Sequence, residues 1–268
     1  MSIVVKNLDF SINDQVIFKN LTFSINEGDF ISIIGLSGSG KTLLSKILTG
    51  QLFTNNNSII IDNTILSPKS FNFLRNKISY IPENINAIII SKNVYEEITF
   101  SLRNLNFPLE KINLLVNEYV LLFKIKDLLY SNLDDLSGGE LYKVGLISNL
   151  ICNPKYLIID NNLDMLDNNS KEEIYSILFY LNKKKGLTII NFSNNICFVN
   201  TLSNNIVLNN KSICLEFKGD ELHNYEKELL EIGFKFPIII DLSIKLKLYN
   251  LIDKIHIKSD ELVVDIWK

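Results

Sequence analysis

The pattern of apolar and polar residues predicts strands and helices in alternation along most of the chain. Antiparallel strands are expected near the start, at 3–5, 9–12 and 21–25. The apolar runs Phe30–Ile34 and Tyr156–Asp160 are typical of strands that are buried on both faces. Shorter strands are expected at Ile59–Ile61, Ile78–Ile81 and 187–190.

Helical periodicity fills the segments between these strands. Helices are expected at 41–49, 94–130 and 171–182, and Pro108 opens a helix within the second of these segments. The apolar face in that segment is expected to contain Leu114, Leu115, Tyr119, Leu122 and Phe123. Strands that alternate with helices predict an α/β fold with a mostly parallel sheet and right-handed crossovers.

One glycine-rich segment carries a chemical signal. The segment fits G-x-x-x-x-G-K-[ST] between a buried strand and a helix, and it consists of Gly35, Leu36, Ser37, Gly38, Ser39, Gly40, Lys41 and Thr42. Such a loop wraps backbone N–H groups around phosphates, and the helix N-terminus adds partial positive charge. Lys41 is expected at the β- and γ-phosphates of ATP, and Thr42 and Asp160 are expected on the Mg²⁺ side.

Composition and charge bear on which partners and which cellular compartment can be expected. The net charge is −3 and the sequence pI is about 5.5, with no block of Lys and Arg, so a nucleic-acid partner is not expected. We find no run of about 18 apolar residues and no signal-peptide pattern. The three cysteines form no C-x-x-C pair and are expected to be buried, reduced thiols: Cys152, Cys197 and Cys214.

A second motif lies between the phosphate loop and Asp160. It comprises Leu136, Ser137, Gly138, Gly139 and Glu140, 20 residues before the aspartate at 160. At this spacing the chain resembles the ABC ATPase family, whose signature is L-S-G-G-Q. The resemblance implies a RecA-like P-loop core with an antiparallel β edge at 1–82 and 151–216, an inserted helical subdomain at 83–150, and a small C-terminal extension at 217–268.

The resemblance also implies how such a chain works. ABC ATPases pair head to tail, so that each ATP contacts the phosphate loop of one subunit and the signature of the other. Ser137 to Glu140 would therefore serve the partner's site, and Asp167 resembles the D-loop aspartate at the dimer contact. ATP would close the pair and tilt a membrane subunit docked against a groove between 83 and 130, where Ile85 and the residues 87–90 form either an apolar lining or simply core.

The resemblance extends to the A component of energy-coupling factor transporters, which import vitamins and metal ions. It rests on the run 164–167 and on tail segments at 228–237, 242–246 and 259–263. It implies a second ABC ATPase subunit, an integral membrane subunit and a separate substrate-binding membrane protein as partners. The chain would lie peripherally on the cytoplasmic face of the membrane. A subunit of another ABC transporter and a non-transport regulatory ABC protein remain alternatives.

Four positions depart from the family pattern. Asn161 stands where the family has a catalytic glutamate, Asn194 replaces the switch histidine, and Glu83 replaces the Q-loop glutamine. Glu83 is unfavourable near a triphosphate unless it binds Mg²⁺. Ile12 stands at the adenine-stacking aromatic, with Phe10 on the same strand face as a possible substitute.

All four departures lie in this chain's own half-site, whereas the signature is intact. They predict an asymmetric heterodimer in which the site on Lys41 binds ATP and hydrolyses it slowly or not at all. Drift is the alternative, because the chain contains 35 Asn residues.

Overall fold

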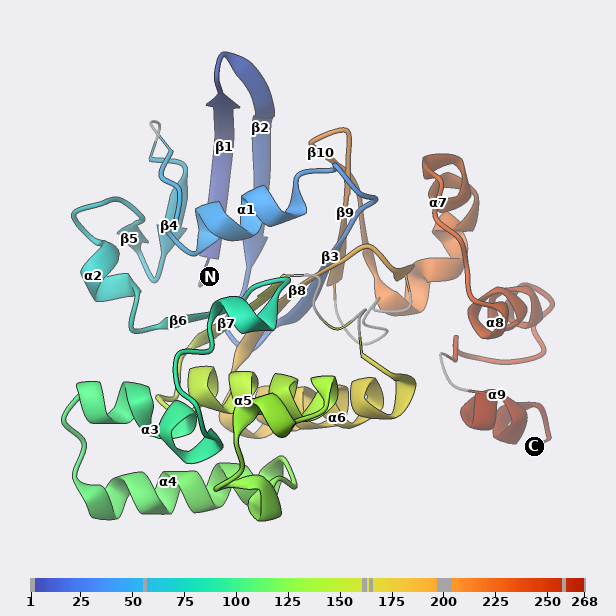
Figure 1. Ribbon diagram of the computed structural model, residues 1–268. Helices are drawn as coiled ribbons and strands as arrows, with labels where there is room; N and C mark the ends of the chain where they lie inside the picture. Colours follow the sequence, from blue (N-terminus) through green and yellow to red (C-terminus); the bar gives the residue numbers. More distant parts are fainter. Residues whose placement is uncertain are drawn as a thin grey trace.

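The computed structural model describes residues 3–54, 57–160, 163, 166–196, 204–256 and 259–267. A central parallel sheet separates two layers: an antiparallel sheet with one helix on one side, and a helical lobe on the other (Figure 1). This layering matches the expected α/β class, because strands buried on both faces need cover on both sides.

The bounds of the elements follow from the backbone. The strands are β1 (Ile3–Ile12), β2 (Gln15–Ile25), β3 (Phe30–Ile34), β4 (Ile59–Ile61), β5 (Thr64–Ile65), β6 (Ile78–Ile81), β7 (Tyr156–Asp160), β8 (Thr188–Ser193), β9 (Asn204–Asn209) and β10 (Ser212–Lys218). The α-helices are α1 (Lys41–Leu48), α2 (Phe71–Leu74), α3 (Val94–Asn104), α4 (Leu109–Leu122), α5 (Gly138–Leu150), α6 (Asn168–Lys185), α7 (Glu226–Ile232), α8 (Ile238–Leu248) and α9 (Ser259–Ile266). Short 3-10 turns include η1 (Ile85–Ala87) and η6 (Gly219–Tyr225).

The central sheet has the order β10-β9-β3-β8-β7-β6, and its strands are parallel except for β10. The strands β3 and β7 are buried at every position. The carboxyl ends of β3, β6, β7 and β8 meet at one edge of the sheet. Ligands of open α/β sheets bind at this edge.

The antiparallel edge is a separate sheet with the order β2-β1-β4-β5. Its core residues pack with α1 onto one face of the parallel sheet; Phe18, Leu44 and Ile158 are examples. The expected early strands are confirmed, although β1 runs unbroken through both predicted segments at 3–5 and 9–12.

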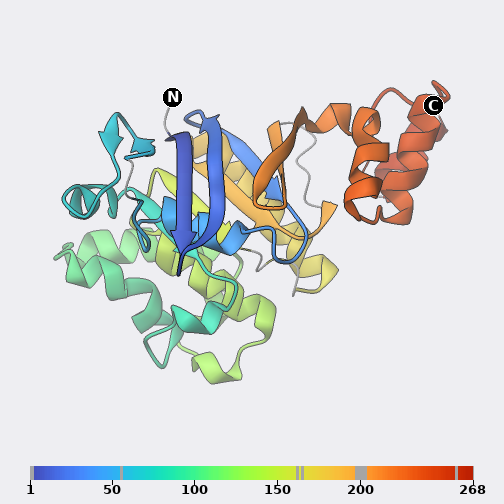
Figure 2. The same cartoon turned by 90° about the horizontal axis from the view of Figure 1, so that it is seen from above.

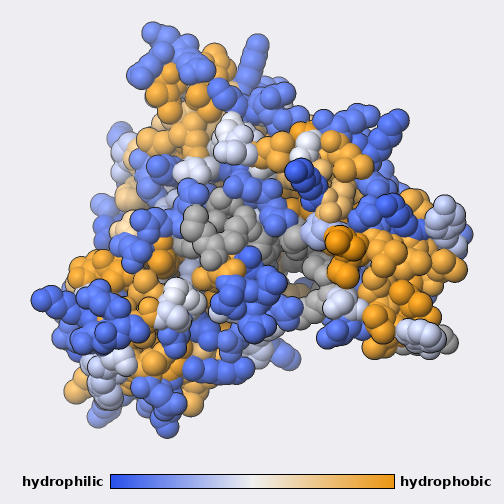
Figure 3. All heavy atoms as spheres, turned by 45° about the vertical axis from the view of Figure 1, so that its right-hand side comes forward, coloured by the Kyte–Doolittle hydropathy of each residue, from blue (hydrophilic) through white to orange (hydrophobic). Residues whose placement is uncertain are grey.

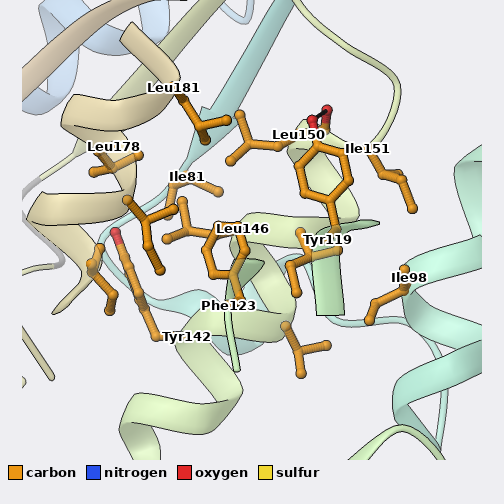
Figure 4. Close-up of a cluster of buried hydrophobic side chains, with 14 of the residues drawn as sticks. Ile81, Ile98, Tyr119, Phe123, Tyr142, Leu146, Leu150, Ile151, Leu178 and Leu181 are labelled. Carbon is orange, nitrogen blue, oxygen red and sulfur yellow. Dashed lines mark hydrogen bonds between the residues drawn. The ribbon is translucent and has the colours of Figure 1, made fainter. Parts of the chain in front are cut away.

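The helical lobe packs α3, α4 and α5 against α6 and the other face of the parallel sheet. The core of this lobe includes the buried side chains of Tyr119, Phe123, Tyr142 and Leu146 (Figure 4). Tyr119 also donates a hydrogen bond of 2.9 Å to the Leu150 carbonyl. The lobe is therefore joined to the sheet by one continuous apolar core.

Two sequence expectations fail in detail. Leu114 was expected on the apolar face of its helix, but its side chain is 71% exposed. The other four predicted residues do face the core: Tyr119 and Phe123 are buried, and Leu115 and Leu122 pack against the same cluster. The fully buried residues of α4 are Ile112, Val116, Tyr119 and Val120. The thiol of Cys214 is exposed on β10 and that of Cys152 is half-buried, whereas Cys197 lies outside the described residues.

The C-terminal helices α7, α8 and α9 gather at one end of the molecule, beyond β9 and β10 (Figure 2). Phe217, Leu222, Leu229 and Ile244 form their core together with Val207 of β9. Large apolar side chains nevertheless remain exposed on this side (Figure 3), among them Ile238, Tyr249, Leu251, Val264 and Trp267. An apolar surface of this kind is typical of an interaction site.

Candidate functional site

The glycine-rich loop connects β3 to α1 at the carboxyl edge of the parallel sheet. Gly40 is the N-cap of α1 with φ 101°, and no side chain caps the helix. The first turn of α1 contains no acidic residue. The N–H groups of this helix end are thus left facing the loop with partial positive charge, which is the geometry that binds phosphate.

Two glycines of the loop are required by close packing. A Cβ atom on Gly35 would lie 2.4 Å from Ser39 Oγ and 2.6 Å from the Leu208 carbonyl oxygen. A Cβ atom on Gly40 would lie 2.8 Å from the ring of Phe18 on β2. The antiparallel sheet therefore packs directly against the loop at Gly40. A larger residue at Gly35 or Gly40 would displace the backbone of the loop.

Lys41 begins α1, and its side chain folds back over the loop. Its ammonium group donates to the carbonyl of Gly35 at 2.7 Å and to that of Leu36 at 3.0 Å, and it lies 3.4 Å from Ser39 Oγ. The side chain is only 6% exposed. The positive charge is consequently held inside the loop, where phosphate oxygens would be bound.

Asp160 ends β7 beside the start of α1 and is fully buried. Its Oδ1 lies 3.4 Å from Thr42 Oγ1. Its Oδ2 accepts hydrogen bonds from Ser45 Oγ at 3.0 Å and from the Tyr80 hydroxyl at 3.1 Å. Burial raises the pKa of Asp160, the three hydroxyl groups oppose that shift, and the nearby charge of Glu83 adds to it.

Ser45 and Tyr80 were not among the residues predicted for the site. Ser45 lies one helical turn after Thr42 on α1, and Tyr80 lies two residues before Pro82 on β6. A hydroxyl in an apolar helix face and one near the end of a buried strand are the only signals that the sequence offered. Neither signal indicates a hydrogen bond to Asp160, which lies 115 residues after Ser45 and 80 residues after Tyr80.

The residue pair Thr42 and Asp160 suits Mg²⁺. Both side chains offer hard oxygen atoms, and Mg²⁺ in nucleotide sites takes few protein ligands because water and phosphate oxygens complete its octahedron. Within the described residues there is no cluster of three His, Cys, Asp or Glu side chains that could hold a metal by itself. The donor set thus fits a metal that arrives with a nucleotide.

Two of the positions that depart from the family pattern, Glu83 and Asn194, lie near the same edge. Glu83 follows β6 and is exposed, and its charge reaches both Asp160 and Tyr80. Asn194 follows β8, whose Ser193 carbonyl accepts a hydrogen bond from the Gly35 N–H at 3.1 Å. Asn161 lies outside the described residues.

The expected adenine-contact residues are near the end of β1. Ile12 is 41% exposed, whereas Phe10 is half-buried against the core of the antiparallel sheet. Register shifts between β1 and β2 flank Phe10. The exposed side chain at this strand end is therefore aliphatic.

The second motif forms the N-terminus of α5. Ser137 is the N-cap, and a capping box joins it to Glu140. The Ser137 N–H and hydroxyl donate to Glu140 Oε2 at 2.8 Å and 2.7 Å. These hydrogen bonds lower the pKa of Glu140, so its carboxylate is ionised at neutral pH.

The same helix end contacts the residue expected in the D-loop. A Cβ atom on Gly139 would lie 2.6 Å from Ser170 Oγ and 3.9 Å from Asp167 Oδ2. Asp167 caps α6 by accepting a hydrogen bond from the Ser170 N–H at 3.0 Å. The signature motif and Asp167 thus share one surface, although the sequence places them 27 residues apart.

A cavity of about 320 Å³ opens where the segment after β6 meets the helical lobe. It is lined by Asn86, Ile89, Ser91, Lys92, Leu133, Asp134, Leu136 and Leu141. Ile85 is instead buried core, and a Cβ atom on Gly145 of α5 would clash with it at 2.5 Å. Ile90 is 67% exposed, so the apolar segment is divided between core, cavity and surface.

Comparison with known proteins agrees with this geometry. The model of the family described as ABC transporter matches residues 18–164, which include the phosphate loop, the signature motif and Asp160. The chain belongs to the ABC transporter family. Within it, the chain is similar to ATP-binding proteins of energy-coupling factor transporters: it is 30% identical to EcfA1 of Mycoplasma genitalium over 98% of this chain and 95% of that protein.

Solved structures share the fold. CbiO1 from Clostridium perfringens, part of the ABC transporter complex CbiONQ, superposes with a TM-score of 0.77 at 24% identity, covering 90% of this chain and 97% of that one. A dimeric ATP-binding cassette in a post-hydrolysis state, bound to ADP and phosphate, superposes with a TM-score of 0.69 at 25% identity, covering 81% and 98%. Among the residues that the structure describes, no helix is both long and apolar enough to cross a bilayer.

Proposed function

We propose that this chain is the ATP-binding subunit of an energy-coupling factor importer, and that it works as one half of a heterodimer at the cytoplasmic face of the membrane. The observation that carries the proposal is the presence of both half-sites on one chain. A phosphate loop with a buried lysine stands on α1, and an intact signature stands at the start of α5. The similarity to EcfA1 over nearly the whole length supports the same class of transporter.

In this proposal the loop from Gly35 to Thr42 holds the phosphates of ATP. Lys41 exchanges its loop carbonyl partners for phosphate oxygens, and the N-terminus of α1 adds backbone donors. Thr42 and Asp160 hold Mg²⁺, which when bound neutralises charge on the phosphates. Glu83 lies close enough to these residues to influence the pKa of Asp160, and it is a further candidate ligand of the metal.

The signature of this chain serves the nucleotide on the partner ATPase. Ser137 and the glycines after it stand at a helix N-terminus, which suits a γ-phosphate that approaches from outside the chain. Asp167 lies beside them at the same surface. The dimeric cassette among the structural neighbours and the apolar C-terminal surface both favour work in an assembly.

The chain's own site is proposed to bind ATP and hydrolyse it poorly. Asn161 cannot accept a proton from water, and loss of a general base costs on the order of 10²–10⁴-fold in rate. Asn194 cannot replace a histidine in that role. A homodimer would contain two sites that hydrolyse ATP poorly. The partner is therefore expected to be a different ATPase subunit with a complete site.

The membrane subunit is proposed to dock at the cavity between the segment after β6 and the helical lobe. Its lining is part apolar and part polar, with Ile89 and Leu141 beside Lys92 and Asp134. Such a groove suits a short amphipathic helix. A separate membrane protein would select the solute, and the family resemblance points to vitamins or metal ions.

ATP hydrolysis tests the proposal directly. The isolated chain is expected to bind ATP with little turnover, and turnover is expected when a second ATPase and a membrane subunit are present. Vigorous hydrolysis by the isolated chain would contradict the degenerate site. Nucleotide binding without any co-purifying membrane subunit would favour the alternative function, a regulatory nucleotide-binding protein.

A further inference from the structure

The carboxylate of Asp160 is held asymmetrically. Oδ1 faces Thr42 Oγ1 at 3.4 Å, whereas Oδ2 is met by Ser45 Oγ at 3.0 Å and by the Tyr80 hydroxyl at 3.1 Å. Asp160 and Ser45 are both fully buried. The two hydroxyl groups on Oδ2 therefore determine which oxygen is left on the side of Thr42.

The hydroxyl groups of Ser45 and Tyr80 are not equally available as donors to Asp160 Oδ2. Ser45 Oγ also lies 2.9 Å from the Thr42 carbonyl oxygen, and one hydroxyl proton cannot serve both acceptors fully. Back-bonding from a serine to the preceding helical turn is common. The Tyr80 hydroxyl is thus the more dependable donor to Asp160 Oδ2.

The strand that carries Tyr80 is itself fixed. The neighbouring Ser79 donates a hydrogen bond of 2.7 Å to the Asn149 carbonyl on α5. In addition, β6 pairs with β7 along its length, so Tyr80 lies beside Ile158 in the ladder. A phenol on such a strand is a rigid donor, and it reaches the carboxylate without an entropic cost comparable to that of a surface side chain.

We propose that Tyr80 is a positioning residue for the Mg²⁺ side of the nucleotide site. Its hydroxyl occupies Asp160 Oδ2 and so holds Oδ1 toward Thr42. The inference rests on the proposed function, because it assumes that Thr42 and Asp160 together receive the metal that accompanies a nucleotide.

The test measures ADP affinity of the full-length chain with Mg²⁺ and with EDTA, for the wild type and for Tyr80→Phe. The substitution removes one oxygen atom and keeps the ring. We expect affinity in Mg²⁺ to fall about 10-fold, the size of one lost hydrogen bond to a charged group, while affinity in EDTA stays within about 2-fold. A titration with Mn²⁺ at saturating ADP, followed by electron paramagnetic resonance, should show the same loss directly.

Tyr142→Phe is the matched control. The Tyr142 hydroxyl is buried and has no hydrogen-bond partner among the described residues, so its removal should leave both affinities unchanged. Ser45→Ala is expected to weaken Mg²⁺-dependent binding less than Tyr80→Phe does, because its proton is shared.

The outcomes are distinct. If Tyr80→Phe lowers affinity equally with and without Mg²⁺, or changes only the melting temperature, the hydroxyl is structural and the inference is wrong. If the wild type gains no affinity from Mg²⁺ or fails to bind ADP, the proposed nucleotide site is wrong instead.

Discussion

The ammonium group of Lys143, on the signature helix α5, lies 2.6 Å from Glu173 Oε2 on α6. Lys124, which follows α4, approaches the other oxygen of the same carboxylate at 3.0 Å. Chiefly through the hydrogen bond from Lys143, this arrangement lowers the pKa of Glu173. One carboxylate thus connects three segments of the chain and fixes the signature helix to the helix that Asp167 caps.

Glu173→Gln is expected to lower the free energy of unfolding by about 1–2 kcal/mol, because Lys143 is left mostly buried without its counter-charge. Urea denaturation at pH 7 measures this change. Asp241→Asn is the control: it breaks the exposed pair with Lys245 on α8 and should leave the urea midpoint nearly unchanged, because exposed ion pairs contribute little to stability. Equal costs for the two variants would contradict a special role for the buried pair.

A second electrostatic cluster stands at the turn between β4 and β5. Asp62 accepts hydrogen bonds from Lys77 at 2.9 Å, Lys155 at 2.8 Å and the Tyr156 hydroxyl at 2.5 Å. Burial raises the pKa of Asp62, but these hydrogen bonds outweigh it and lower the pKa to about 2. The ionised form therefore stabilises the fold above the ordinary value of 3.8, and this stability is lost as the pH falls toward 2.

Asp62→Asn is accordingly expected to cost about 1 kcal/mol at pH 7, after allowance for solvent screening, and less as the pH falls below 4. Asn tolerates the φ of 47° at this position, so backbone strain adds little. Asp14→Asn makes the same change at an exposed turn with φ 63° and should be neutral. Unfolding curves at several pH values measure both, and a cost for Asp62→Asn that does not change with pH would contradict the ion cluster.

The signature offers a substitution that separates folding from assembly. A Cβ atom on Gly138 would meet no other atom within 4 Å, so Gly138→Ala should leave the stability of the chain within about 0.5 kcal/mol. In a complex with the partner ATPase, the added methyl group would stand between the helix end and the partner's nucleotide. We expect turnover of the complex to fall at least about 10-fold, while this chain's own affinity for ATP is unchanged. Undiminished turnover would argue against a signature that acts across the interface.

Restoring the missing groups provides the converse experiment. Asn161→Glu together with Asn194→His returns a general base and a histidine to the chain's own site. A general base contributes on the order of 10²–10⁴-fold to the rate. If the site is otherwise competent, we expect ATP turnover to rise by about 10-fold or more. Turnover is measured in a complex whose partner site carries a phosphate-loop substitution. No gain would mean that Glu83 or Ile12 also limits this site.

Much of the fold could be predicted from the sequence, because the central strands β3 and β7 are apolar runs that are buried at every position. The bounds of β3 and β7 match the apolar runs: β3 ends at Ile34, directly before Gly35, and β7 ends at the carboxylate of Asp160. The strands β9 and β10 were not predicted, because their residues are interrupted by Asn209-Asn210-Lys211. Asn210 and Lys211 have positive φ values of 46° and 64°, which make this segment a tight hairpin turn.

The candidate site also contains residues that the sequence predicted and residues that it did not. The phosphate loop and the signature are local motifs, so their residues could be named in advance. The hydroxyl groups of Ser45 and Tyr80 act on Asp160 across 115 and 80 residues. The pairing of β6 with β7 brings Tyr80 to the carboxylate, and the packing of α1 against β7 brings Ser45 to it. The exposure of Leu114 was also beyond the sequence, because α4 carries leucines on its inward side, at Leu115 and Leu122, and on its exposed side, at Leu114 and Leu121.

The most direct test of the nucleotide site compares the ATP affinity of the wild-type chain with that of Lys41→Ala and Lys46→Ala. Lys46 lies in the last turn of the same helix and controls for a lost positive charge. We expect the wild type and Lys46→Ala to bind ATP alike, and Lys41→Ala to bind at least about 10-fold more weakly while remaining folded. A wild-type chain that does not bind ATP, or a Lys41→Ala chain with unchanged ATP affinity, would contradict a nucleotide site built on Lys41.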